Sequence, residues 1–225
     1  MSNAEKHGEA LDFDPDELRR KYQLERDKRI RPEGSEQYNE VAGDFSHYIE
    51  DPYVNATHKR EPLNDDIDVA IIGGGFGGLI TAARFSEKGI NNIRVIEKGG
   101  DFGGTWYWNR YPGAACDTES YIYLPLLEEL GFVPKEKYTH APEILQHCRN
   151  IAKHYDLYDR ACLQTEVSKL EWDESVKRWI VRTNRGDAMR ARFVVMSNGP
   201  MNRPKLPGIK GINSYQGHTF HTSRW

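Results

Sequence analysis

A glycine-rich run in the first half of the chain has the spacing of a phosphate-binding turn. Residues 73–78 read GGGFGG, a GxGxxG pattern that follows the apolar run Val69–Ile72 and opens a helix-like stretch. In that setting the first glycine allows a tight turn, the second lets the backbone approach a diphosphate, and the third lets helix pack on strand. Unpaired N–H groups at the start of such a helix favour an anion. The pattern predicts a dinucleotide site, with a ligand-free glycine turn as the alternative; its predicted cofactor-binding residues are Gly73, Gly75, Phe76 and Gly78.

A carboxylate follows the next apolar run, Ile93–Ile96, and completes the pattern of a βαβ unit. Glu97 stands 19 residues after Gly78. A carboxylate at this place accepts hydrogen bonds from ribose hydroxyls and would repel a 2'-phosphate. Glu97 therefore favours FAD or NAD over NADP at this site, with Lys98 beside it as a further predicted contact. A solvent-facing glutamate at a strand end is the alternative.

A second loop combines glycines with aromatic residues. Residues 101–113 read DFGGTWYWNRYPG. Glycines let backbone pass close to a flat ring system, and aromatic side chains exclude water around it. Because a site for NAD alone needs no such second loop, this run favours FAD. An aromatic loop with a purely structural role is the alternative.

Two motifs make the chain resemble flavin-dependent Baeyer–Villiger monooxygenases of the single-chain, NADPH-using type. The first is the run GGTWYWNRYPG, followed by CDTES at 116–120. The second is that family's fingerprint FxGxxxHxxxW, whose spacing is matched by Tyr215, Gly217, His221 and Trp225, with Tyr replacing the leading Phe. The resemblance covers roughly residues 68–225, and the acidic extension before them is similar to that of some family members.

The resemblance implies roles for particular residues. The turn at Gly75 and the carboxylate of Glu97 hold the adenosine diphosphate half of FAD. The other FAD contacts that it implies are Lys98, Gly104, Thr105, Trp106, Cys116, Tyr123 and Val167. Residues 104–106 line the flavin and its ribityl chain, and the backbone at 167 meets the adenine.

Two residues carry the implied catalytic roles. The resemblance places Asp117 beside the isoalloxazine ring and near the nicotinamide. It assigns His221 to the hinge that couples the FAD and NADPH domains, without a role in proton transfer. Taken from the sequence alone, His221 is better interpreted as an ordinary polar residue. No spacing in the chain predicts a metal site.

The activity that the resemblance implies is the conversion of a ketone to an ester or lactone. NADPH reduces FAD, the reduced flavin and O₂ give a C4a-peroxyflavin, and this attacks the ketone; the protein supplies position and electrostatics. A flavin monooxygenase that oxygenates nitrogen or sulfur is one alternative, although the run Trp106–Trp108 and the trailing Trp225 favour the Baeyer–Villiger branch. A non-catalytic flavin-binding module is the other.

The chain departs from the family pattern in two ways. Ala115 stands where the family usually has an arginine, which removes a cation that could contact NADPH. The family also continues past the fingerprint into a second GxGxxG domain that binds NADPH and supplies an active-site arginine. We expect a family member to be about twice as long as these 225 residues. The chain is thus expected to bind FAD without completing NADPH-driven oxygenation alone, and a complementary chain with the NADPH domain is the candidate partner.

The elements that must position these residues are those of an α/β fold. Residues 67–214 are predicted to form a Rossmann-like FAD-binding domain with a parallel sheet, and 215–225 a hinge leading to the NADPH domain. Apolar residues at helical spacing predict a helix over 142–155. Alternating segments predict a small β-meander whose last strand returns to the main sheet, with strands at 165–172, 178–183 and 189–196.

Residues 1–66 are predicted to be an acidic extension of helix and loop. They hold 17 Asp and Glu against 10 Lys and Arg. Asp14 and Pro15 have the types expected at a helix start, and a helix from there could run to about Ile30. The extension is either a solvated surface arm or a cover for a partner domain.

Composition excludes several classes of function. The net charge of −3 argues against a nucleic-acid binder. Three cysteines without CxxC spacing argue against a disulfide framework and a zinc ribbon. No apolar run approaches the roughly 18 residues of a membrane span. The first residues lack the basic and apolar regions of a secretory signal. These features predict a cytoplasmic protein.

Overall fold

The computed structural model describes residues 12–54 and 59–225. The parts of the predicted extension at 1–11 and 55–58 lie outside the described residues. The chain divides into two compact units, Met1–Glu40 with Lys205–Tyr215, and Val41–Pro204 with Gln216–Trp225. The predicted division of the sequence at residues 66 and 214 stays a prediction.

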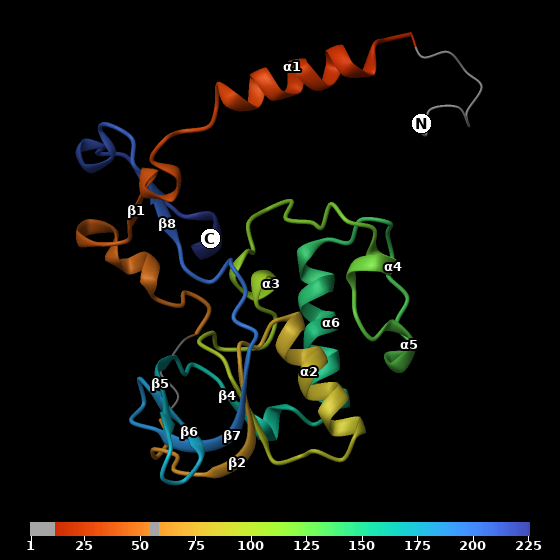
Figure 1. Ribbon diagram of the computed structural model, residues 1–225, viewed down its shortest axis with the longest axis vertical. Helices are drawn as coiled ribbons and strands as arrows, with labels where there is room; N and C mark the ends of the chain where they lie inside the picture. The colour runs from red at the N-terminus through yellow and green to blue at the C-terminus, as the bar shows by residue number, and fades with distance from the viewer. Residues whose placement is uncertain (1–11, 55–58) are drawn as a thin grey trace. The chain divides into compact units, whose positions relative to one another are not determined.

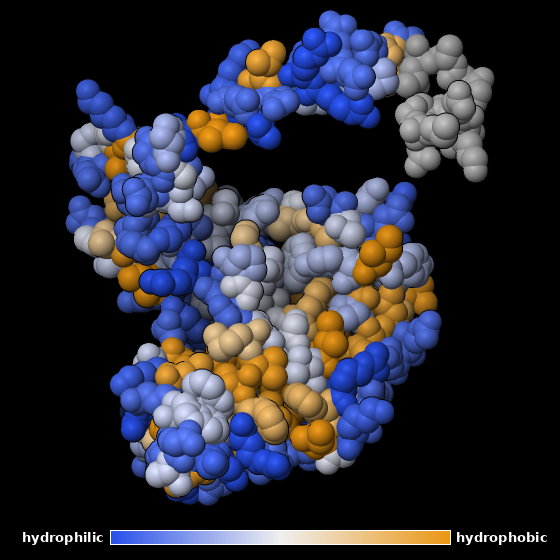
Figure 2. Space-filling model, in the orientation of Figure 1, coloured by the Kyte–Doolittle hydropathy of each residue, from blue (hydrophilic) through white to orange (hydrophobic). Residues whose placement is uncertain are grey.

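The smaller unit contains helix α1 (Pro15–Asp27) and several short elements. The Asp14 carboxylate accepts hydrogen bonds from the backbone N–H groups of Asp16 (2.8 Å) and Glu17 (3.3 Å), so α1 begins where the cap predicts. No residue of α1 is buried, and Figure 2 shows its surface as mostly hydrophilic. The other elements are η1 (Gly34–Gln37), η4 (Ile212–Ser214), and the antiparallel pair β1 (Tyr38–Glu40) and β8 (Lys205–Pro207).

The larger unit is built on a six-stranded sheet with the order β4-β3-β2-β7-β6-β5. The first four strands in that order run parallel, and the pairs β7–β6 and β6–β5 are antiparallel. The strands are β2 (Asp66–Ile72), β3 (Ile93–Ile96), β4 (Ala161–Cys162), β5 (Val167–Asp173), β6 (Arg178–Thr183) and β7 (Ala188–Met196). The predicted α/β class is confirmed.

Strand β2 lies at the centre of the sheet because its side chains are apolar on both faces. Val69 and Ile71 pack in the core cluster that includes Leu79 of a neighbouring helix. Ala70, between them, packs in the cluster on the other face with Val181 of the meander. The continuous apolar run predicts a strand that is covered on both faces, and β2 is such a strand.

Helices α2 (Phe76–Glu87) and α6 (Ala141–His154) cover one face of the sheet and lie side by side (Figure 1). Their inward residues belong to the same cluster as Ile71 of β2, and Cys148 and Ile151 of α6 are fully buried. The helix predicted over 142–155 from its apolar spacing is confirmed within one residue at each end.

The antiparallel part of the sheet is the predicted meander. Strand β6 pairs with both β5 and β7, and β7 then lies parallel to β2. The last strand of the meander thus returns to the main sheet, as predicted. This return places the residues after Met196 next to the glycine turn.

The long stretch between β3 and α6 contains helices that the sequence did not predict. They are α3 (Thr105–Trp108), α4 (Ser120–Tyr123) and α5 (Leu127–Leu130). Four residues are too few for an apolar period to show. The remaining short elements of this unit are the 3-10 helices η2 (Gly43–Ile49), η3 (Tyr158–Arg160) and η5 (Thr222–Arg224).

Two further properties concern the described part of the chain alone. Among residues 12–54 and 59–225, no helix combines the length and apolar character needed to cross a membrane. The same residues contain no group of three or more His, Cys, Asp or Glu side chains arranged to hold a metal ion.

Candidate functional site

A cavity opens where the carboxyl ends of three parallel strands meet. Ile72 of β2 is the register partner of both Ile96 of β3 and Met196 of β7, so the three strands end together. The residues that follow them are Gly73, Glu97 and Ser197. The cavity has a volume of about 510 Å³. This edge is where open α/β sheets bind their ligands.

The cavity collects most of the residues predicted from the sequence. The predicted cofactor-binding residues that line it are Gly73, Gly75, Phe76, Glu97, Lys98, Gly104, Thr105, Trp106, Tyr123 and Val167. They come from the β2–α2 turn, the end of β3, helices α3 and α4, and the start of β5.

The first and last glycines of the turn are required by close backbone contacts. Gly73 has a φ of +109°, and a Cβ there would collide with the backbone carbonyl of Ser197. A Cβ on Gly78 would collide with the carbonyl oxygen of Gly73. Gly73 therefore makes the tight turn and Gly78 the helix–strand contact, as the pattern predicts.

The middle glycine brings two loops together. Gly75 caps α2, and a Cβ on it would lie 3.4 Å from the Cα of Gly104. Gly104, with a φ of +53°, is more constrained, since its Cβ would lie 2.7 Å from the Cα of Gly75. The backbones at the start of α2 and of α3 thus approach closely at the cavity, and Phe76 and Gly77 present the first turn of α2 to it.

Glu97 is buried at the centre of this edge, with 7% of its surface exposed. Its two carboxylate oxygens accept hydrogen bonds from the backbone N–H groups of Gly74 and Gly99, each at 2.6 Å. Burial raises the pKa of Glu97, while these two N–H groups act in the opposite direction. Because each carboxylate oxygen can accept a second bond, Glu97 both holds the turn and keeps acceptor capacity toward the cavity.

An aromatic wall lines the cavity beside the glycines. The Trp106 Nε1–H donates to the Tyr123 hydroxyl at 3.0 Å, and the Tyr123 ring lies 5.3 Å from that of Phe76. Burial raises the pKa of Tyr123, which therefore stays a neutral phenol. Trp108, 2% exposed, adds a second indole to the wall. A wall of this kind suits a flat, uncharged ring system.

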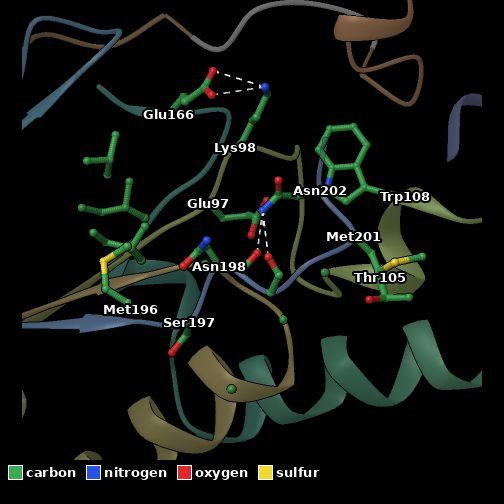
Figure 3. Close-up of a pocket in the computed structure, with 18 of the residues that line it drawn as sticks. Glu97, Lys98, Thr105, Trp108, Glu166, Met196, Ser197, Asn198, Met201 and Asn202 are labelled. Atoms are coloured by element: carbon green, nitrogen blue, oxygen red, sulfur yellow. Dashed lines mark hydrogen bonds and ion pairs between the residues drawn. The ribbon is translucent and has the colours of Figure 1, made fainter. Parts of the chain in front are cut away.

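An ion pair borders the cavity next to the start of β5 (Figure 3). The Lys98 ammonium lies 3.3 Å from the Glu166 carboxylate. Val167 and Leu170 of β5 line the same part of the cavity. The cavity thus combines a charged rim near β5 with an aromatic wall.

The segment that follows β7 also lines the cavity, and the sequence analysis missed it. The Asn202 side-chain amide donates to the backbone carbonyl of Asn198 at 2.6 Å and closes a turn that brings Met201 opposite Thr105 (Figure 3). A signal was present: Ser197 and Asn198 are polar residues directly after a predicted strand of the main sheet. That position is where ligand contacts occur in parallel sheets.

Other predicted residues lie outside the cavity lining. Cys116 is buried in the cluster around Trp106, and Asp117, directly after it, is exposed. Ala115, which replaces the arginine of the family pattern, is exposed and pairs with His140 in an isolated β-bridge. The predicted functional roles of Cys116 and Asp117 stay predictions.

His221 lies in the C-terminal segment, away from the cavity lining. Its Nδ1 accepts a hydrogen bond from the backbone N–H of Ser223 at 3.1 Å, so the ring proton of the neutral form is on Nε2. The His221 ring packs 6.0 Å from that of Tyr48, whose hydroxyl donates to Thr219 at 3.0 Å. These contacts join the C-terminal segment to residues of the predicted extension.

Taken together, the geometry suits a long ligand with three chemically different parts. Backbone N–H groups at the start of α2 favour an anion. The Glu97 carboxylate favours hydroxyl donors, and the wall at Trp106 and Tyr123 favours a flat ring. A dinucleotide carrying an aromatic ring system combines all three.

Comparison with known proteins agrees with this geometry. The family model described as pyridine nucleotide-disulphide oxidoreductase matches residues 70–225. Neopentalenolactone D synthase of Streptomyces avermitilis is 54% identical over 213 residues, which make up 94% of this chain and 36% of that protein. A Baeyer–Villiger monooxygenase of Stachybotrys chlorohalonatus is 52% identical over 96% of this chain and 35% of its own length.

Solved structures give the same result. The polycyclic ketone monooxygenase of Thermothelomyces thermophila has a TM-score of 0.84 and 38% identity, over 93% of this chain and 36% of that one. OTEMO in complex with FAD and NADP has a TM-score of 0.66 and 33% identity, over 74% of this chain and 31% of that one. The match to the polycyclic ketone monooxygenase covers more of this chain than residues 67–225 make up, so it includes much of the predicted extension.

The chain spans about a third of the length of the curated relatives that it matches. The expected factor of two therefore understates their length. The resemblance to Baeyer–Villiger monooxygenases, drawn from two motifs, is confirmed by relatives that match nearly the whole chain. The chain belongs to the pyridine nucleotide-disulphide oxidoreductase family.

Proposed function

We propose that this chain is the FAD-binding part of a Baeyer–Villiger monooxygenase, which uses NADPH and O₂ to convert ketones to esters or lactones. The observation that carries the proposal is the cavity at the strand ends. It joins the Gly75–Gly104 contact, the Glu97 carboxylate and an aromatic wall, in a chain 52% identical to a Baeyer–Villiger monooxygenase.

The residues of the cavity fit FAD part by part. The start of α2 binds the diphosphate, where Gly75 leaves room for it. The remaining acceptor sites of Glu97 bind the ribose hydroxyls, and Lys98 and Val167 border the adenosine end. Thr105, Trp106 and Tyr123 exclude water around the flavin. FAD, when bound, supplies the redox chemistry and the activation of O₂, while this chain orients it.

We assign the residues outside the lining to the domain coupling. Asp117 is proposed to border the flavin next to the active-site arginine of the NADPH-binding part, with Cys116 holding the start of its loop in the core. His221, in the 215–225 hinge after an FAD domain over 67–214, is proposed to couple the two domains. Ala115 leaves NADPH one cation fewer to contact.

The relatives' greater length supports a requirement for an NADPH-binding part, carried either on a complementary chain or on further sequence. We propose that the complete enzyme acts in the cytoplasm, which cell fractionation would test. Added to the FAD-loaded chain, the remaining two-thirds of a close relative should restore ketone-dependent NADPH consumption. Ester formation would support the Baeyer–Villiger activity, N- or S-oxide formation the alternative oxygenase, and no consumption a non-catalytic flavin-binding module.

The FAD site is tested by Gly75→Ala, with Lys88→Ala at the exposed far end of α2 as the control. The new methyl at 75 would occupy the space against Gly104 where the diphosphate approaches, so we expect no flavin to remain after gel filtration. Lys88 does not line the cavity, and that variant should bind FAD normally.

The measurement is an FAD titration of the full chain followed by the visible spectrum of the gel-filtered protein. A yellow Gly75→Ala protein with unchanged affinity for FAD would refute the assignment of the diphosphate site to the start of α2. Thermal unfolding of both variants shows whether a loss of binding reflects the site or the fold.

A further inference from the structure

Arg224 is a buried cation in the C-terminal segment, with 8% of its surface exposed. Its Nε donates to the backbone carbonyl of Glu50 at 3.0 Å. Its Nη1 donates to the backbone carbonyl of Ser223 at 2.6 Å. Its Cζ lies 4.1 Å from the centre of the Trp108 ring. Arg224 therefore links the C-terminal segment to the extension and to the aromatic wall.

Arg224 forms no ion pair with a carboxylate of the described chain, and its Nη2 has no hydrogen-bond partner there. Burial lowers the pKa of Arg224, although the charges of Asp51, Tyr53 and Tyr107 act in the opposite direction. A buried cation without a close anion is costly. Its stabilisation thus comes from backbone carbonyls and from the face of Trp108.

Trp108 is the residue through which this contact reaches the cavity. Its side chain lines the cavity close to Thr105, and its backbone carbonyl accepts a hydrogen bond from the Tyr53 hydroxyl at 3.2 Å. Arg224 does not line the cavity; it contacts the indole that does. The guanidinium therefore packs on a ring that forms part of the wall.

We propose that Arg224 is a positioning residue that holds the Trp108 ring against the cofactor cavity. The inference rests on the proposed function only in taking FAD as the ligand. Through this contact, the placement of residues 216–225 acts on the flavin site. Arg224 also donates a hydrogen bond to the Glu50 backbone carbonyl. This second contact links the segment around residue 50 to Trp108, so that segment is a structural part of the site.

The chain offers a matched control in Arg110. Its Cζ lies 3.8 Å from the ring centre of Tyr53 and 4.6 Å from that of Tyr107, and neither ring lines the cavity. Arg110→Gln removes the same kind of cation–ring contact without touching Trp108. It should change the Kd for FAD less than twofold.

The test is an FAD titration of the full chain and of Arg224→Gln, Arg224→Lys and Arg110→Gln. Arg224→Gln should raise the Kd for FAD about tenfold, the scale of a desolvated cation–π contact. Arg224→Lys keeps a cation over the ring and should recover most of the affinity. In a Trp108→Leu background, Arg224→Gln should have little further effect, because the ring through which it acts is gone.

Near-ultraviolet circular dichroism of the ligand-free chain reads the ring itself. The Trp108 signal, defined by the difference between wild type and Trp108→Phe, should shrink in Arg224→Gln and stay in Arg110→Gln. Unchanged signal and unchanged affinity in Arg224→Gln, or equal losses in both Trp108 backgrounds, would overturn the proposal. A wild-type chain that binds no FAD, with the dichroism changed as expected, would sink the proposed function and leave the positioning role standing.

Discussion

At the residue scale, Glu97 has two tasks that one side chain can combine. Its carboxylate accepts the N–H groups of Gly74 and Gly99, which fixes the turns after β2 and β3. It also lines the cavity, where its remaining acceptor sites face the ligand. The sequence argument assigned Glu97 to the ligand alone, and the tertiary structure adds the turn-holding role.

Replacing Glu97 by Gln should therefore cost both stability and binding. The amide keeps one acceptor oxygen, so its NH₂ group meets one of the two backbone N–H groups, and a buried donor is left unpaired. We expect a loss of about 1–3 kcal/mol in the free energy of unfolding, measured by urea denaturation. The Kd for FAD should rise at least about tenfold, because losing a charged acceptor for the ribose hydroxyls costs about 1.4 kcal/mol or more of binding free energy.

Glu143→Gln is the control for this change. Its carboxylate accepts a single exposed N–H bond from Lys135 at 3.2 Å, which a Gln oxygen can also accept. Both quantities should stay near the wild-type values. An equal loss in the two variants would contradict a special role for Glu97.

At the element scale, helix α6 supports the aromatic wall and carries a buried histidine. His147 is fully buried, its Nε2 contacts the backbone carbonyl of Pro125 at 2.7 Å, and its ring stacks 4.6 Å from that of Phe132. The His147 Nδ1 has no hydrogen-bond partner in the described chain. Burial lowers the pKa of His147, and the Pro125 contact only partly opposes this. The helix is therefore built around a neutral imidazole.

This arrangement predicts a pH-dependent stability. Below about pH 6.5 the unfolded chain protonates this histidine while the folded chain resists it, so the unfolded state binds more protons. Stability should fall with decreasing pH, by up to about 1.4 kcal/mol per pH unit for one proton. Urea denaturation between pH 7 and 5 should show that slope reduced in His147→Gln. His154→Gln, at the exposed end of the same helix, should retain it; equal slopes in all three proteins would contradict the assignment.

At the scale of the whole molecule, the extension is not uniform. Residues up to 40 belong to the smaller unit, whereas residues from 41 belong to the larger one. Within the larger unit, the Asp51 carboxylate accepts hydrogen bonds from the Tyr107 hydroxyl (2.6 Å) and the Gly100 N–H (3.0 Å). Tyr48 is buried with 4% exposed. Residues around 50 are thus part of the site-bearing body.

Two truncations separate these parts. Removing residues 1–40 should leave the Kd for FAD within about twofold of the full chain's value. The free energy of unfolding of the larger unit should change by less than about 0.5 kcal/mol. Removing residues 1–54 should destabilise that unit by roughly 4 kcal/mol, because one hydrogen bond of Tyr48, one of Glu50 and two of Asp51 are lost at about 1 kcal/mol each. Urea denaturation and FAD titration measure both. If the two truncated chains behave alike, the extension acts as the uniform surface arm that its composition suggested.

The sequence alone predicted the elements whose signals are local. Buried strand β2 followed by a glycine turn, the cap of α1 by Asp14, and the apolar spacing of α6 each depend on neighbours a few residues apart. Most of the residues that the sequence assigned to the site also line the cavity, because a strand–glycine–helix unit places its turn at the ligand-binding edge of the sheet. The preference for FAD came from Glu97 and the loop at 101–113, whereas NADPH and the ketone substrate came from the family resemblance.

Only the tertiary structure showed which distant segments share the cavity. Asn198 and Glu97 line the same cavity because β7 pairs parallel with β2, and no local sequence pattern encodes that strand order. The same holds for Arg224 on Trp108 and Asp51 on Tyr107, contacts between segments that the chain separates by 116 and 56 residues. Such contacts depend on how the elements pack. The residue types therefore determined what this site can bind, and the packing decided which remote residues hold it in shape.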